Sequence, residues 1–201
     1  MKPVTLVVPS KYPDIFEAFR ANIEAVEPAV PKILIRTGEE IHRPLGWITF
    51  QGRDPFIYAR NVNLGWVVSW PNDVLLTGDD VHFEKPFIEK LQEVAYSDPT
   101  IGFAVPELGG QSCFVCAYIK RELIEAVGYL DENFTGYGTE DNDFYRRFEA
   151  AGWRTQPVRD LGVTHQGGTS FYRREHEGGP NVAEESKKNW AVYNQKWGVK
   201  E

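Results

Sequence analysis

Short apolar runs alternate with helical apolar patterns along the first half of the chain. Five runs are rich enough in aliphatic and β-branched residues to form buried strands, at residues 4–8, 32–36, 47–50, 73–77 and 101–105. After the first run, Asp14 and Glu17 have the spacing of a capping box, and apolar residues then recur at helical spacing up to Val26. A second helical pattern covers residues 86–96. This rhythm predicts an α/β fold, in which a sheet carries helices on its faces.

The second half of the chain has a looser pattern that contains a glycine-rich stretch. We expect a short helix at 121–127 and a C-terminal helix at 182–201. Between them, residues 167–181 are rich in Gly, Arg and His and lack apolar periodicity, which predicts a mobile loop. No linker separates two independent cores, so we predict a single domain with a first half at 1–105 and a second half at 106–181.

An acid-rich helix follows a loop of glycines and aromatic residues. Thr139 is a natural N-cap, apolar residues then recur at helical spacing, and Gly152 supplies a stop. Glu140 and Asp141 therefore fall in the first helical turn. The loop at 134–138 is of a composition that lets the backbone pass close to a ligand. Acids in a first turn also complement the helix dipole, so a purely structural role is the alternative.

Composition and charge narrow the range of functions. Hydrophobic residues make up 42% of the chain and charged residues 25%, as in ordinary soluble domains. The net charge of −7 argues against general binding to nucleic acid or anionic membranes, so a few local cations or a metal must hold any phosphate. No apolar stretch is long enough to cross a bilayer or to form a signal-peptide core, and we expect a cytoplasmic protein. Cys113 and Cys116 lack the further ligands of a zinc site and are expected to be reduced structural thiols.

A second pair of acids comes at the end of a predicted strand, in the sequence Gly78-Asp79-Asp80. In open α/β sheets ligands gather at the carboxyl ends of strands, and Gly78 lets the backbone turn there. Adjacent carboxylates repel each other unless a cation neutralises them, and Mg²⁺ and Mn²⁺ prefer such oxygen ligands. A solvated turn is the alternative. His165 ends another strand-like run, so it is either a structural histidine or a further metal ligand.

Three cationic or titratable side chains lie in the predicted mobile loop, namely Arg173, Arg174 and His176. The fork of donors on arginine suits a diphosphate, so the loop is a candidate lid over such a group. Solvated surface charge is the alternative. The chain contains no Gly-x-Gly-x-x-Gly and no P-loop sequence, which argues against nucleotide binding of those types.

Six segments, taken in order, resemble the family 2 glycosyltransferases over essentially the whole chain. They are Val-Val-Pro-Ser at 7–10, Ala-Arg-Asn-Val-Asn-Leu-Gly at 59–65, Gly-Asp-Asp at 78–80, the stretch from 127 to the Gly-Thr-Glu-Asp-Asn-Asp at 138–143, His-Gln-Gly-Gly-Thr-Ser at 165–170 and Lys-Trp-Gly at 196–198. The resemblance implies a GT-A fold with a mixed, mostly parallel central sheet flanked by helices, in a Rossmann-like nucleotide-binding half and an acceptor-side half. It also implies a nucleotide-diphosphate sugar donor, a glycan or other hydroxyl acceptor, and a divalent metal, Mn²⁺ or Mg²⁺.

The resemblance also implies roles for single residues. Asp80 would hold the metal, and His165 would complete the protein ligands. The acid pair would supply the base, with Asp141 in that role and Glu140 as the second choice. The residues expected to bind the nucleotide-sugar are Pro9, Ser10, Tyr12, Arg60, Asn63, Gly78, Asp79 and Arg173.

The chain departs from the family pattern in two places. Gly78 stands where the family has the first acid or amide of its metal motif. Arg36-Thr37-Gly38 replaces an acid-rich strand end, which leaves open how the nucleotide's base is recognised. We interpret the chain as an inverting, metal-dependent, hexosyltransferase-like enzyme, in which the metal stabilises the leaving diphosphate while Asp141 deprotonates the acceptor. Two other classes stay open: a metal-dependent nucleotidyltransferase and a catalytically silent carbohydrate-binding domain.

Overall fold

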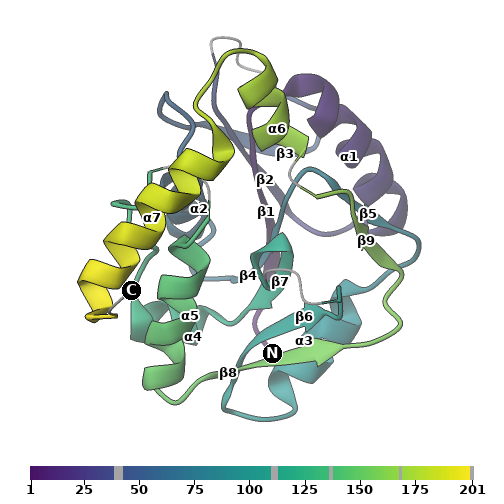
Figure 1. The fold of residues 1–201 in the computed structure, drawn as a ribbon. Helices are drawn as coiled ribbons and strands as arrows, with labels where there is room; N and C mark the ends of the chain where they lie inside the picture. Colours follow the sequence, from purple (N-terminus) through teal and green to yellow (C-terminus); the bar gives the residue numbers. More distant parts are fainter. Residues whose placement is uncertain (39–42, 110–112, 136–137, 168, 200–201) are drawn as a thin grey trace.

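A seven-stranded sheet with the order β3-β2-β1-β4-β7-β6-β8 forms the centre of the molecule (Figure 1). This computed structural model describes residues 1–38, 43–109, 113–135, 138–167 and 169–199. The strands are β1 (Val4–Ser10), β2 (Lys32–Arg36), β3 (Trp47–Gln51), β4 (Asp73–Thr77), β6 (Ile101–Pro106), β7 (Cys116–Ile119) and β8 (Arg154–Val158). Only β7 runs against its neighbours β4 and β6, so the sheet is mixed and mostly parallel. The predicted α/β fold is confirmed.

Helices cover both faces of the sheet, because its inner strands bury side chains on both sides. Every residue of β2, β4 and β6 is buried, as expected of strands between two helical layers. On one face lie α1 (Pro13–Val26) and α3 (Ile88–Tyr96), and on the other α2 (Tyr58–Val68), α4 (Arg121–Val127) and α5 (Glu140–Ala150). A Cβ on Gly65 would lie 2.3 Å from Val7 Cγ1, so this glycine lets α2 approach β1 closely.

The C-terminal segment adds two helices outside these layers. They are α6 (Thr169–His176) and α7 (Val182–Trp197), and α7 lies beside α5 (Figure 1). A separate two-stranded sheet joins β5 (Val81–Phe83) to β9 (Val163–His165) in antiparallel pairing. No helix in the described ranges is long and apolar enough to span a membrane.

Three expectations from the sequence are wrong. Asp14 and Glu17 form no capping box, because α1 begins at Pro13 and Tyr12 occupies the N-cap position without a side-chain cap. The helix of the acid pair begins at Glu140 and Thr139 occupies its N-cap position, both as expected, but Thr139 has a φ of 84° and its side chain does not make the expected capping bond. The segment expected to be a mobile loop contains helix α6.

The cysteine segment is only partly a strand. Cys113–Val115 forms a 3₁₀ turn, and β7 begins at Cys116. Cys116 is a free thiol, and its burial raises its pKa to about 12, as expected of an unreactive structural cysteine. The side chain of Cys113 and residues 136 and 137 of the glycine-aromatic loop lie outside the described part of the chain.

Candidate active site

The first site feature is a buried hydrogen bond between the ends of β1 and β4. These strands are parallel, and their register pairs Val7 with Leu76. Ser10 is the last residue of β1, and Asp79 lies two residues beyond the end of β4. Ser10 Oγ donates to Asp79 Oδ2 at 2.6 Å, and both side chains are buried. The parallel pairing of β1 and β4 and this hydrogen bond therefore bring two of the predicted site residues together at the carboxyl edge of the sheet.

The second feature is the pairing of Asp80 with His165. The small sheet brings them together, because Val81 of β5 pairs with His165 of β9 and the Gln166 amide donates to the Asp80 carbonyl at 3.2 Å. His165 Nε2 lies 3.2 Å from Asp80 Oδ1, with only 13% and 12% of the two side chains exposed. A Cβ on Gly78 would lie 2.8 Å from Asp80 Oδ1, so the glycine leaves room for this orientation of the carboxylate.

The donor set at this point fits a divalent ion that is bound together with a substrate. Asp80 and His165 offer one oxygen and one nitrogen ligand. Within the described ranges, no group of three or more His, Cys, Asp or Glu side chains could enclose a metal by itself. Mg²⁺ and Mn²⁺ commonly bind with such an incomplete protein shell and take further oxygen ligands from substrate phosphates. The two residues can therefore be the protein part of a metal site that a diphosphate completes.

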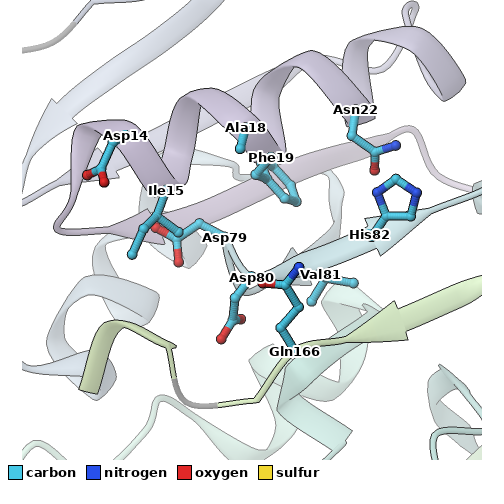
Figure 2. A pocket seen from close by; sticks show the side chains of 10 residues that line it. All are labelled: Asp14, Ile15, Ala18, Phe19, Asn22, Asp79, Asp80, Val81, His82 and Gln166. Atoms are coloured by element: carbon cyan, nitrogen blue, oxygen red, sulfur yellow. The ribbon is translucent and has the colours of Figure 1, made fainter. Parts of the chain in front are cut away.

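A pocket of about 280 Å³ adjoins these acids. Helix α1 forms one wall, and Asp79, Asp80 and Gln166 lie across from it (Figure 2). Gln166 was not among the predicted site residues. Its position beside His165 at the end of a strand-like run is the signal that identifies it. Asp14, in the first turn of α1, also lines the pocket.

Helix α6 contacts the start of α1 through one arginine. Arg173 donates to Asp14 Oδ2 at 2.6 Å and to Glu177 Oε1 at 3.0 Å, and its guanidinium lies 4.3 Å from the centre of the Tyr12 ring. The Tyr12 hydroxyl donates to Glu177. Burial is the largest cause that raises the pKa of Tyr12 to about 12, and this hydrogen bond is the second. Arg173 and Tyr12, both expected to bind the donor, thus lie together beside the pocket, with Arg173 paired to carboxylates.

Two predicted donor-binding residues on α2 lie apart from this cluster. Asn63 exchanges hydrogen bonds of 2.9 Å with the backbone N–H and carbonyl of Leu130, so it ties α2 to the segment after α4. Arg60 Nε lies 3.6 Å from Glu132 Oε2 in the same segment. Both line a second pocket of about 650 Å³ that shares no lining residue with the first. Pro9 is buried inside β1 and pairs in register with Ile35.

The acid pair lies at the same edge of the sheet as the Asp80 cluster. Helix α5 ends at Ala150 and β8, which is parallel to β6, begins at Arg154. Because so short a connection joins them, α5 runs back along the sheet and its N-terminus lies at the carboxyl edge of the parallel strands. Glu140 and Asp141 begin this helix.

The two adjacent acids have different environments. Glu140 is 7% exposed and its Oε2 has no hydrogen-bond partner in the described chain, whereas Asp141 is partly exposed. Burial, and then the charge of Asp141, raises the pKa of Glu140 to about 8. Asp141 Oδ1 accepts a hydrogen bond of 2.8 Å from the Asn142 amide. At neutral pH Glu140 therefore holds a proton.

A third acid of this helix, Asp143, belongs to the segment that resembles the family, but the sequence assigned it no role. Asp143 is fully buried and accepts hydrogen bonds from Arg147 Nε at 2.9 Å and Trp197 Nε1 at 3.0 Å. Lys196 Nζ lies 2.8 Å from its Oδ1. The spacing of Asp143 and Arg147, one helical turn apart, is the signal that could have indicated a paired structural acid.

Comparison with known proteins identifies the fold. A family model described as the N-terminal domain of galactosyltransferase matches residues 105–176, less than half of the chain. No curated protein sequence gives a significant match. Among solved structures, the mannosyltransferase PcManGT from Pyrobaculum calidifontis, in complex with GDP-Man and Mn²⁺, is similar with a TM-score of 0.65 and 16% identity over 87% of this chain and 61% of that one.

Two further structures agree. A mutant of Drosophila β1,4-galactosyltransferase 7, in complex with manganese, UDP-Gal and xylobiose, has a TM-score of 0.59 and 15% identity over 86% of this chain and 74% of that one. S. aureus TarS has a TM-score of 0.63 and 9% identity over 85% of this chain and 38% of that one. The chain has the GT-A fold. It spans less than two thirds of the length of PcManGT, and at these identities the likeness establishes the fold alone.

Proposed function

We propose that this protein is an inverting, metal-dependent glycosyltransferase of the family 2 type, which moves a hexose from a nucleotide-diphosphate sugar to an acceptor hydroxyl. The observation that carries the proposal is the pairing of Asp80 with His165 at the carboxyl edge of a GT-A fold. PcManGT and the Drosophila enzyme, which share this fold, were each solved with a nucleotide-sugar and manganese. The family model that matches the second half also describes a galactosyltransferase.

On the donor side, Asp80 and His165 would hold Mn²⁺ or Mg²⁺ against the diphosphate. A bound divalent ion supplies charge neutralisation for the leaving group. Ser10 holds the Asp79 carboxylate by its 2.6 Å hydrogen bond, which fixes that acid at the pocket wall for contact with the donor. Since the chain carries a net charge of −7, few other groups can offset the charge of a diphosphate.

On the acceptor side, Asp141 is the better base of the acid pair. A general base must be ionised and must reach the proton that it removes. Glu140 is buried and, with a pKa of about 8, protonated at neutral pH, whereas Asp141 is partly exposed. Asp141 would remove the hydroxyl proton as the acceptor attacks the sugar from the face opposite the leaving diphosphate. Attack from that face inverts the anomeric carbon.

A thermal-shift panel tests the donor half of the proposal. Nucleoside diphosphates and their sugars are added with Mn²⁺, with Mg²⁺ or with EDTA. A ligand that binds only the folded state raises the melting temperature. We expect nucleotide and metal together to raise it by more than the sum of their separate effects. Equal stabilisation with and without EDTA would contradict the metal site, and the nucleotide with the largest effect identifies the donor class.

A further inference from the structure

Helix α7 contacts the backbone just before the acid pair. The side chain of Asn189, which is 2% exposed, donates from Nδ2 to the carbonyl of Gly138 at 2.8 Å. Gly138 precedes Thr139, Glu140 and Asp141 in the chain. Asn189 is the buried polar residue in the middle of a helix whose other buried side chain is Val182. A buried amide in this position is best explained by the carbonyl that it satisfies.

The backbone that Asn189 holds leads directly into a strained residue. Gly138 and Thr139 have positive φ, at 76° and 84°, which is normal for glycine but not for threonine. A threonine rarely adopts such an angle, and conformations of this kind persist only where the surroundings enforce them. The Thr139 side chain does not help, because its buried Oγ1 has no hydrogen-bond partner in the described chain. The hydrogen bonds of this turn are made by its backbone, which accepts from Asn189 at the Gly138 carbonyl and from the Asp143 amide at the Thr139 carbonyl.

A second contact of α7 fixes the first turn of α5. Asp143 receives the indole N–H of Trp197 at 3.0 Å, while its own amide closes the first turn by donating to the Thr139 carbonyl at 3.0 Å. The Trp197 ring also stacks under the guanidinium of Arg146, 4.4 Å from its centre. Asn189 thus holds the backbone at Gly138, just before α5, and Trp197 holds Asp143 in the first turn of α5. Asp141 lies between these two residues in the chain.

We infer that α7 is a positioning element for the acceptor-side base, and that Asn189 is its principal positioning residue. This inference rests on the proposed function, since it takes Asp141 as the base. The side-chain amide of Asn189 holds the Gly138 carbonyl, which keeps the turn at Gly138 and Thr139 in place. This turn sets the direction in which the Asp141 side chain points from the first turn of α5. No residue of α7 lines the pocket beside Asp79 and Asp80, so we expect donor binding to be independent of Asn189.

The test compares Asn189→Leu with Asn194→Leu. The two changes are identical and lie on the same helix, but the Asn194 side chain makes no hydrogen bond in the described structure. For Asn189→Leu we expect kcat to fall on the order of 100-fold, the cost of displacing a catalytic group by about an ångström, while nucleotide-metal affinity stays within about twofold. Amide hydrogen exchange at 139–143 should become faster in this variant only. Asn194→Leu should match the wild type in all three measurements.

Each other outcome has a definite meaning. Unchanged kcat and exchange in Asn189→Leu would overturn the inference, and so would an equal loss of donor affinity, which indicates a general structural role. If Asn189→Leu does not fold, Trp197→Phe keeps an aromatic ring beside Arg146 but removes the N–H donor to Asp143, and its kcat should fall without loss of donor affinity. A wild-type protein with no transfer activity would refute the proposed function, while the exchange measurement would still decide whether Asn189 holds the turn.

Discussion

Replacing Glu140 by glutamine should stabilise the folded protein at pH 7 and leave its stability unchanged at pH 4. Glu140 is 7% exposed, and burial together with the charge of Asp141 raises its pKa from 4.5 to about 8. Below pH 4.5 the carboxyl is protonated in both the folded and the unfolded chain. Between pH 4.5 and 8 the unfolded chain releases this proton and the folded chain retains it, so the free energy of unfolding falls as the pH rises.

The size of the effect follows from this interval. One unit of pH over which the two states differ by a proton corresponds to about 1.4 kcal/mol. From pH 4.5 to pH 7 the burial of Glu140 therefore costs on the order of 3 kcal/mol. Glutamine has the same shape and no charge, so the variant avoids this cost. For a domain of this size, about 3 kcal/mol corresponds to a rise in melting temperature of roughly 6–12 °C.

Urea unfolding of wild type and Glu140→Gln at several pH values between 4 and 8 checks the reasoning. The difference in unfolding free energy should be near zero at pH 4 and should grow steadily to pH 7. Glu149→Gln provides the control, because Glu149 is exposed on the same helix and the substitution should have no such effect. A difference that does not change with pH, or a destabilised Glu140→Gln at pH 7, would show that Glu140 is ionised in the folded protein.

Three further predictions concern the proposed chemistry. Asp141→Asn should lower turnover on the order of 10²–10⁴-fold with donor affinity nearly intact, as measured by steady-state kinetics and titration of nucleotide with metal; a stable, fully active variant would place the base elsewhere. Asp80→Ala should weaken metal-linked nucleotide binding in thermal-shift titrations more than His165→Ala, because it removes a charge, and unchanged metal affinity in His165→Ala would make the histidine structural. Gly78→Ala should also weaken Mn²⁺ binding, since its Cβ would lie 2.8 Å from Asp80 Oδ1; wild-type affinity would show that the observed carboxylate orientation is not needed.

The parts of the fold that could be predicted are the segments whose apolar pattern in the sequence matches the surfaces that they bury in the structure. The buried strands read as apolar runs because both of their faces meet helices. Helix α2 could not be predicted from its pattern, because it buries the polar residues Asn61 and Asn63. These interrupt the apolar stripe that identifies a helix. Helix α6 contacts α1 through the ion pair of Arg173 with Asp14, which are far apart in the sequence. A contact between charged side chains produces no apolar periodicity, so no pattern in the sequence indicated this helix.

The candidate site shows the same division. The sequence predicts Asp79, Asp80 and His165 as site residues because strand ends carry ligand-binding residues, and the structure brings Asp80 and His165 within 3.2 Å. The burial of Glu140 could not be predicted, because its neighbours come from the tertiary fold and not from the adjacent sequence. Asn189 gave no signal for the same reason, since its partner is a backbone carbonyl some fifty residues earlier in the chain.

The anomeric configuration of the transferred sugar tests the central claim most directly. The wild-type protein is incubated with an α-linked nucleotide-sugar, Mn²⁺ and candidate acceptors, and the product is followed by ¹H NMR. We predict that the nucleoside diphosphate is released, that the new glycosidic bond is β, and that EDTA stops the reaction. An α-linked product would contradict inversion, release of pyrophosphate would indicate nucleotidyl transfer, and sugar transfer that continues in EDTA would contradict the role of Asp80 and His165.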